Sequence, residues 1–390
     1  MSVGTVAAEP LEEIVARFVQ DEVAPQADAH DRSATLNRAL LARAGALGLL
    51  GITLPVADGG RGGDMLDAAT AHRRLAWADP GFAIAFLAQT ILFTHNFAAL
   101  ADEGQRRRVL PRVLAAEWIG GMAMTEPSGG TDVLAMRSRA ERVPGGYVVQ
   151  GAKTLITNAP DAQCFLVYAK LDGDVTSFLV ERDRAGVSVG PPIDKMGMRA
   201  APMAELVLDA CFVPRQNLLG RERAGIVQMM RNLEIERVCL AAMAVGVAER
   251  CVHEMIDDAS SLDAAGRPRA EDGHVQRHLA EGHAHTAAAR SLLDDVAGRR
   301  NPALASRVGA DSVKLFAART AKDVADRAVQ VRGMAGVCRE RGLERLLRDA
   351  KLLEIGGGTL EAHQRNVALD LVRAARIAAH RSGGRDAGER

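Results

Sequence analysis

Apolar residues recur every three or four positions through the first 120 residues, a spacing typical of amphipathic helices. The first such run, 11–31, is expected to end as a helix near Pro25. The run at 82–100 is apolar nearly all round, so we expect it to be buried. Further helical runs are predicted at 36–51, 67–80 and 102–118.

The pattern changes after Trp118. Short runs rich in β-branched and aromatic residues, separated by Gly, Pro and Asp, occupy about 147–214 and predict a compact antiparallel sheet or barrel. Helical spacing returns near Gly225, and 226–259 contains no proline, which predicts one long helix. Further helices are expected at 274–298 and 303–333 and on both sides of the glycines at 356–358, before a disordered tail at 381–390. We therefore predict a mainly α fold with a central β domain, divided into 1–120, 121–224 and 225–380.

Composition narrows the range of functions. Lys+Arg and Asp+Glu balance at 49 each and aromatic residues make up 3%, which argues against a nucleic-acid or membrane-surface role. The five cysteines show no CxxC spacing and fit reduced thiols. The N-terminus has no basic start followed by an apolar core, and no apolar run approaches the ~20 residues of a membrane span. We expect a soluble cytoplasmic protein.

Two polar motifs stand where helices give way to strands. AMTEPSGGTDV, at 123–133, combines the hydroxyls of Thr125, Ser128 and Thr131 with two glycines that can expose backbone amides. This arrangement suits a polar ring or a phosphate, although such a stretch alone is also consistent with a simple turn. GAKTLITNAP, at 151–160, places Thr157 and Asn158 at a strand end.

With DKMGMRAAPMAELVLDACFVPRQNLLG and RAVQVRGMAGVCRERGLERLLRDAKLLEIGGGT, these motifs resemble the acyl-CoA dehydrogenase family over about 9–378. The resemblance implies an N-terminal helical domain, a middle β-barrel-like domain and a C-terminal four-helix bundle, assembled as homodimers or homotetramers. It also implies FAD as cofactor and an acyl thioester of coenzyme A or acyl carrier protein as substrate. The product is then a trans-2-enoyl thioester, and electrons leave to an electron-transferring flavoprotein.

The resemblance assigns the cofactor site residue by residue. Thr157 is expected beside the flavin N5, and Gln330 is expected to reach the adenosine half from a neighbouring subunit. The alternative for each is a purely structural hydroxyl or amide. The full set expected to contact FAD is Met124, Thr125, Gly130, Thr131, Ile156, Thr157, Gln330 and Thr359.

The family removes the α-proton of the thioester with a carboxylate. Most members carry it as a Glu two residues before the threonine of the last motif, where this chain has Gly357. A branch resembling isovaleryl-CoA dehydrogenase keeps the base on the long helix in a pattern like LDLERL, and LEIERV here places Glu236 at that position. Glu234 is a competitor that helical spacing does not exclude. Gly357 would retain a backbone N–H for the thioester carbonyl.

Three positions depart from the family pattern. The usual Arg-x-x-Phe-Gly stretch, which helps hold FAD across the subunit interface, has Leu262 and Ala265 in the Arg and Phe places, with Arg267 or Arg269 as conceivable replacements for the charge. This chain has Leu155 where the family often has an aromatic residue that covers the flavin. It has Gly333-Met334 where the family usually has two glycines after the glutamine motif. We therefore expect a rebuilt, weaker FAD site.

Other readings remain open. Relatives that use molecular oxygen, as oxidases or monooxygenases, typically lose the carboxylate base, and a non-catalytic relative would keep only the bundle. Four histidines (His274, His278, His283 and His285) share a polar segment that we interpret as a solvated helix face, without a metal. GGRGG, at 59–63, lacks the Lys-Ser/Thr of a phosphate-binding loop.

Overall fold

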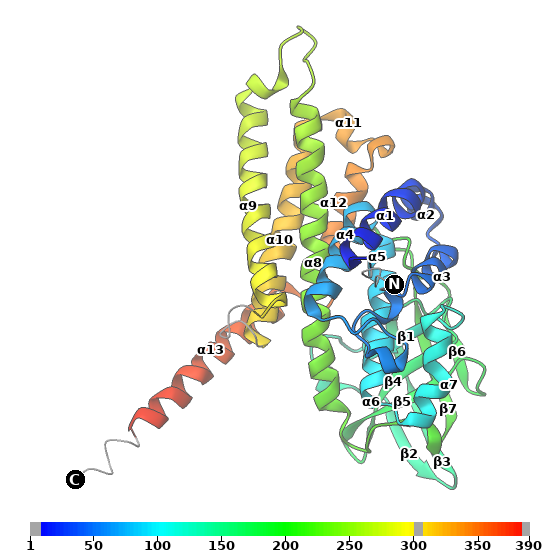
Figure 1. Cartoon of the computed structure of the whole chain (residues 1–390). Coiled ribbons are helices and arrows are strands. Elements are labelled where there is room, and N and C mark those ends of the chain that lie inside the picture. Colours follow the sequence, from blue (N-terminus) through cyan, green and yellow to red (C-terminus); the bar gives the residue numbers. More distant parts are fainter. Residues whose placement is uncertain (1–8, 300–306, 384–390) are drawn as a thin grey trace, which may run out of the picture.

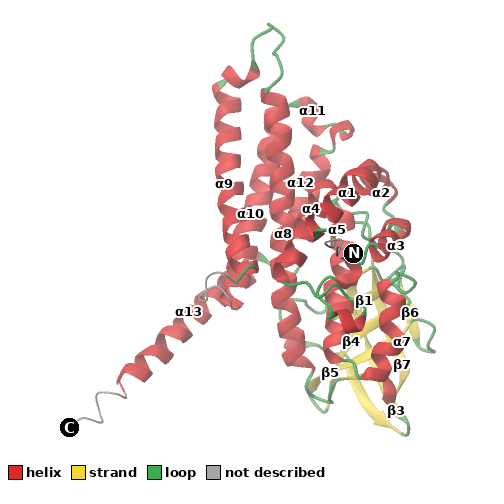
Figure 2. Cartoon of the chain, viewed as in Figure 1, coloured by secondary structure: helices red, strands yellow, loops and turns green. Residues whose placement is uncertain are grey.

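The computed structural model of the chain describes residues 9–299 and 307–383 (Figure 1). Helices come first, a sheet follows, and a bundle of long helices completes the chain (Figure 2). The predicted fold class is therefore confirmed. The N-terminal helices are α1 (Leu11–Phe18), α2 (Ala27–Ser33), α3 (Arg38–Ala46), α4 (Met65–Ala78), α5 (Pro80–Leu87), α6 (Asn96–Leu100) and α7 (Glu103–Leu114).

Two expectations for this region were wrong. The first helix does not end at Pro25, because the chain stays helical there through a 3₁₀ turn, Ala24–Gln26. Proline is tolerated in the first positions of a helix, since a backbone N–H at these positions would have no helical partner. The second expectation was that no apolar run approaches the length of a membrane span. The segment Pro80–Leu100 contradicts it, because it is long and apolar enough, by length and composition, to cross a membrane. However, 78% of its apolar window is buried within the protein, as expected of a core helix.

The sheet has eight strands in the order β6-β7-β3-β2-β4-β5-β8, with β1 paired to β4. The pairings β1–β4 and β2–β4 are parallel, which corrects the prediction of a purely antiparallel sheet. The strands also begin earlier than the predicted 147. The sequence pattern did not indicate β1 (GGMA), because this strand has no alternation of apolar and polar residues. Its glycine at 120 lets the strand lie against Phe93. The strands are β1 (Gly120–Ala123), β2 (Arg139–Val143), β3 (Gly146–Thr157), β4 (Cys164–Leu171), β5 (Asp174–Glu181), β6 (Val187–Val189), β7 (Met203–Pro214) and β8 (Leu218–Leu219).

The bundle begins with α8 (Gly225–Ala259), the single long helix that the sequence predicts. It packs against α4, where Gly246 allows close contact because a Cβ there would lie 2.1 Å from the carbonyl oxygen of Arg73. The remaining helices are α9 (Gly273–Ala297), α10 (Arg307–Arg332), α11 (Met334–Val337), α12 (Leu343–Leu353) and α13 (Leu360–Gly383). Helix α13 points away from the body (Figure 1). The predicted disordered tail lies outside the described residues from 384 onward, and 381–383 belong to α13.

Candidate functional site

Glu236 lies on the buried face of α8, opposite the turn between α12 and α13. Gly357 occupies that turn with a φ of +67°, and a Cβ there would lie 3.5 Å from Oε1 of Glu236 and 2.2 Å from Leu240. The side chain of Glu236 is 7% exposed, and its Oε2 has no hydrogen-bond partner among the described residues. A buried carboxylate oxygen without a partner requires an explanation, and a catalytic role is one.

Burial raises the pKa of Glu236 to about 7, although Arg237 and Lys314 act in the opposite direction. A carboxyl group with a pKa near neutrality is suited to general base catalysis. Glu234, the competing candidate, is only half-buried. The structure therefore separates two glutamates that the sequence pattern leaves equivalent.

A buried cluster of charged residues lies behind Glu236. Lys314, on α10, is fully buried and donates a hydrogen bond of 2.7 Å from Nζ to the carbonyl oxygen of Gly358. Burial lowers the pKa of Lys314 to about 8, while Glu236 raises it. Arg237 pairs with the fully buried Asp311 at 3.2 Å, and His363 contacts that same carboxylate. Cations from α8 and α10 thus flank the turn that faces Glu236.

The two polar motifs after β1 and in β3 come together at the edge of the sheet. The backbone N–H of Thr154 donates to the carbonyl oxygen of Thr125 at 2.9 Å, and Lys153 Nζ reaches the carbonyl oxygen of Met124 at 3.2 Å. Leu155 has a φ of +58° at a bulge between β3 and β7, and its side chain is 52% exposed. Within the described residues, the hydroxyls of Thr125, Thr131 and Thr157 make no hydrogen bond to protein and remain accessible.

A buried ion pair fixes this junction. Lys153 Nζ lies 2.8 Å from Oε1 of Glu126, and both side chains are almost fully buried. Glu126 also accepts hydrogen bonds from the N–H groups of Arg137 and Ser138 and from the Ser138 hydroxyl. Burial raises the pKa of Glu126, but these hydrogen bonds outweigh it and lower that pKa to about 2. The stretch carrying Thr125 is therefore anchored by a permanently ionised carboxylate.

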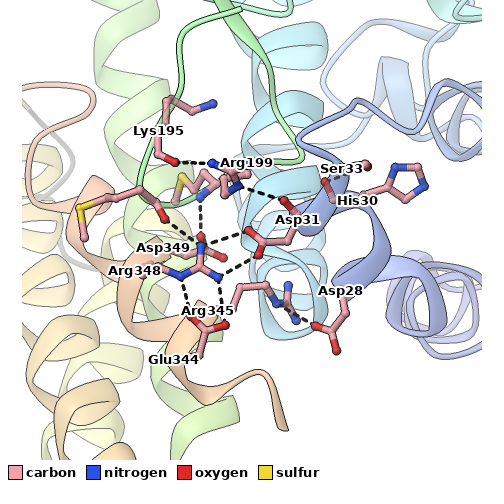
Figure 3. Close-up of polar contacts among 12 residues, drawn as sticks. Asp28, His30, Asp31, Ser33, Lys195, Arg199, Glu344, Arg345, Arg348 and Asp349 are labelled. Atoms are coloured by element: carbon pink, nitrogen blue, oxygen red, sulfur yellow. Dashed lines mark hydrogen bonds and ion pairs between the residues drawn. The ribbon is translucent and has the colours of Figure 1, made fainter. Parts of the chain in front are cut away.

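A second polar cluster holds α12, the helix that leads into the Gly357 turn. Arg348 Nη2 contacts Asp31 Oδ2 at 2.8 Å, and its Nη1 donates to the carbonyl oxygen of Met196 at 2.8 Å (Figure 3). Arg199, from the loop before β7, donates to the carbonyl oxygen of Asp31 at 3.1 Å. Asp349 accepts from the backbone N–H of Met198, and burial raises the pKa of Asp349 to about 7. These contacts tie α12 to α2 and to the loop between β6 and β7.

Family models match nearly the whole chain. They are described as the N-terminal, middle and C-terminal domains of acyl-CoA dehydrogenase and match residues 6–117, 121–211 and 223–371. The chain belongs to the acyl-CoA dehydrogenase family. Members of this family are flavoproteins, and the family assigns the chain to the flavin oxidoreductases that act on a CH–CH bond.

Several relatives resemble this acyl-CoA dehydrogenase over almost their full length. Isovaleryl-CoA dehydrogenase from Oryza sativa is 35% identical over 370 residues, which cover 93% of this chain and 90% of the relative. The structure of butyryl-CoA dehydrogenase from Megasphaera elsdenii has a TM-score of 0.88 at 28% identity, covering 93% and 97% of the two chains. The prolyl acyl carrier protein oxidase AnaB has a TM-score of 0.88 at 27% identity, with coverage of 93% and 97%.

The structure brings most of the predicted residues of this acyl-CoA dehydrogenase into two groups. Met124, Thr125, Ile156 and Thr157 lie at the joined motifs, and the exposed Gly130 and Thr131 follow Thr125 in the same loop. Glu236, Gly357 and Thr359 form the second group around the turn before α13.

Gln330 belongs to neither group. It is the third residue from the end of α10. That end of the helix leads into α11 and lies away from the sheet (Figure 1). Its side chain is exposed, so within one chain it does not meet the other candidates.

The structure does not support Arg267 or Arg269 as a replacement for the arginine of the family's Arg-x-x-Phe-Gly stretch. Leu262 and Ala265 are exposed at the α8–α9 turn. Arg269 instead pairs with Asp258 at 2.7 Å and donates to the carbonyl oxygen of Val331. Arg267 pairs with Asp263 at 2.9 Å. Both arginines have partners within their own chain.

Three charged residues near the site escaped the sequence reading. Asp311 and Lys314 stand three residues apart on α10, among the buried Ala310, Val313 and Ala317. The sequence did contain a signal for these two residues: they are charged and lie on an otherwise apolar helical stripe. A charge on a buried stripe requires a buried partner. The third, His363, gave no signal in the helical pattern, since its partner is 52 residues away.

A flavin nucleotide fits the chemistry of the first group. The accessible hydroxyls of Thr125, Thr131 and Thr157 are suited to a polar ring system and its phosphates. Gly130 stands against Thr125, where a Cβ would lie 3.0 Å from the threonine methyl group. Within the described residues, no group of three or more His, Cys, Asp and Glu side chains is arranged to hold a metal ion.

Proposed function

We propose that this member of the acyl-CoA dehydrogenase family uses FAD to convert an acyl thioester into its trans-2-enoyl thioester. The observation that carries the proposal is the buried Glu236, which faces Gly357 with Oε1, keeps Oε2 free of partners among the described residues and has a pKa raised to about 7. Oε2 would accept the α-proton of the substrate, since a base must approach its proton within hydrogen-bond distance. When bound, FAD supplies the hydride acceptor, N5 of the flavin, for the hydrogen on the β-carbon.

Gly357 would contribute its backbone N–H to the thioester carbonyl. Within the described residues this N–H donates to no backbone carbonyl, so it is available for a substrate oxygen. A donor aimed at the carbonyl stabilises the enolate-like charge that builds up as the α-proton leaves. The donor on the turn would then act on the carbonyl oxygen, and the base on α8 would act on the adjacent α-carbon.

The FAD contacts would come from Met124, Thr125, Gly130, Thr131, Ile156, Thr157 and Thr359 of one chain. Gln330 would serve a second copy, since it is exposed at the opposite end of the bundle. The projecting α13 supports a homodimer or homotetramer, because Leu369, Leu371 and Val372 are more than half exposed. Electrons would pass to an electron-transferring flavoprotein, and the cytoplasmic location stays a prediction.

The acyl carrier is tested by flavin bleaching. Anaerobic addition of short and branched acyl-CoA thioesters, and of the same acyl groups on acyl carrier protein, should bleach the 450 nm band of the purified yellow protein. Bleaching by CoA thioesters identifies that carrier, whereas bleaching by carrier-protein thioesters alone redirects the assignment. A colourless protein that no added FAD restores would contradict the proposal and favour a non-catalytic relative.

An oxidase is the second candidate, because the similar AnaB is an acyl carrier protein oxidase. The retained carboxylate at Glu236 favours a dehydrogenase. Oxygen consumption during turnover without any other acceptor would distinguish the two: a dehydrogenase should reoxidise slowly in air, and an oxidase should produce stoichiometric hydrogen peroxide.

A further inference from the structure

His363 stands on the first turn of α13 with both ring nitrogens engaged. Nδ1 lies 2.5 Å from Oδ1 of Asp311, and Nε2 lies 3.0 Å from the carbonyl oxygen of Gly358. Both contacts are to oxygen acceptors, so Nε2 must carry a hydrogen and a further proton must lie between Nδ1 and Oδ1. The Asp311–His363 pair therefore holds two protons, whichever group formally carries the second one.

Asp311 also connects this pair to the helix that carries Glu236. Its Oδ1 is 3.2 Å from Nη1 of Arg237, and its Oδ2 is 3.4 Å from Nδ2 of Asn366. Arg237 follows Glu236 directly in sequence and favours the ionised form of that carboxyl. The fully buried Asp311 therefore joins the helix that carries Glu236 to the imidazole of His363.

The Gly358 carbonyl receives two donors. His363 Nε2 approaches it at 3.0 Å and Lys314 Nζ at 2.7 Å. Gly358 has a φ of +106°, which only glycine adopts readily. Because glycine is equally free to adopt other conformations, the backbone alone does not hold the turn in this shape. The two side-chain donors instead hold the peptide that follows Gly357.

We propose that Asp311 and His363 are positioning residues for the site: Asp311 holds the His363 ring, and His363 clamps the Gly357–Gly358 turn that faces Glu236. Their part in catalysis rests on the proposed function, whereas their hold on the turn does not. Lys314 from α10 donates to the same carbonyl oxygen and stays in place when His363 is changed.

The first test measures the mobility of the turn directly. In the FAD-loaded enzyme, amide hydrogen exchange in the segment 355–360 should become roughly tenfold faster in His363→Phe, which keeps a ring but removes both ring nitrogens, because local opening becomes easier. Asp311→Asn should also speed this exchange, whereas Asp326→Asn, an exposed change on the same helix, should leave it unchanged. Unchanged exchange in both His363→Phe and Asp311→Asn would overturn the clamp.

The second test uses the wild-type protein and depends on no variant of Asp311. The imidazole ¹⁵N spectrum, with His363 assigned through His363→Gln, should show a proton on Nε2 and a strongly hydrogen-bonded proton between Nδ1 and Asp311 near pH 7. A bare Nε2 would overturn the clamp, because the contact with the Gly358 carbonyl oxygen needs a donor there. Bleaching of the wild type by acyl thioesters is scored separately, so failure of the proposed function would leave both readouts interpretable.

Discussion

A Cβ at position 357 would lie 3.5 Å from Oε1 of Glu236, so the turn before α13 and the base candidate on α8 face the same space. Family relatives that carry their base on this turn, and those that carry it on the long helix, thus have two routes to one position. Gly357 leaves the space to Glu236. The position without a side chain is what makes room for a carboxylate delivered from α8.

Replacing Gly357 by alanine should damage this arrangement. The new methyl group would meet Leu240 at 2.2 Å, and the φ of +67° costs an L-residue about 1–2 kcal/mol. We expect lower unfolding free energy and slower turnover, measured by urea unfolding and by flavin bleaching. Gly273→Ala is the matched control, since a Cβ there meets nothing within 4 Å. Equal stability of the two variants would contradict the predicted crowding.

The pH dependence of stability should report on Glu236. Its pKa rises from 4.5 to about 7 on folding, so folding favours the protonated carboxyl. The resulting stability is fully present below pH 4.5 and is lost as the pH rises through about 7. The shift corresponds to about 3 kcal/mol. Between pH 5 and 8, the unfolding free energy of the wild type should therefore fall more steeply than that of Glu236→Gln.

Asp349 does not confuse this comparison. Burial also raises its pKa to about 7, but it is present in both proteins and cancels in the difference. Urea unfolding at closely spaced pH values, with equal flavin content, gives the two curves. Parallel curves would show that Glu236 has an ordinary pKa in the folded protein.

Breaking the Glu126–Lys153 pair should weaken both the fold and flavin retention. Lys153→Met leaves the carboxylate of Glu126 buried without its cation, which typically costs about 3–5 kcal/mol. The stretch carrying Thr125 would also lose the hydrogen bond from Lys153 to Met124. We expect a lower melting temperature and faster loss of flavin on gel filtration.

A surface pair provides the control for that experiment. Arg107 and Glu103 form an ion pair in which both side chains are more than two-thirds exposed. Arg107→Met should change the unfolding free energy by at most about 0.5 kcal/mol and leave flavin retention unaffected. If Lys153→Met changed the unfolding free energy and flavin retention no more than Arg107→Met, the buried pair would not anchor the stretch carrying Thr125.

Sequence periodicity was enough to predict the helical regions and the long helix α8, because these depend on local apolar spacing. It missed β1, whose Gly120 is explained only by the ring of Phe93 packed against it. Family motifs indicated Glu236 and Thr157 as candidates, since the matching motif positions carry chemistry in the family. Asp311, Lys314 and His363 stayed hidden because their roles depend on contacts between α8, α10 and α13 that no local pattern encodes.

The most direct test of the account is anaerobic flavin bleaching by an acyl thioester in Glu236→Gln. The variant should keep its bound FAD but reduce it roughly 10²–10⁴ times more slowly than the wild type, the usual contribution of a general base. Glu234→Gln, two residues away, should bleach at nearly the wild-type rate. Wild-type bleaching in Glu236→Gln, or loss of bleaching in Glu234→Gln alone, would contradict the assignment of the base to Glu236.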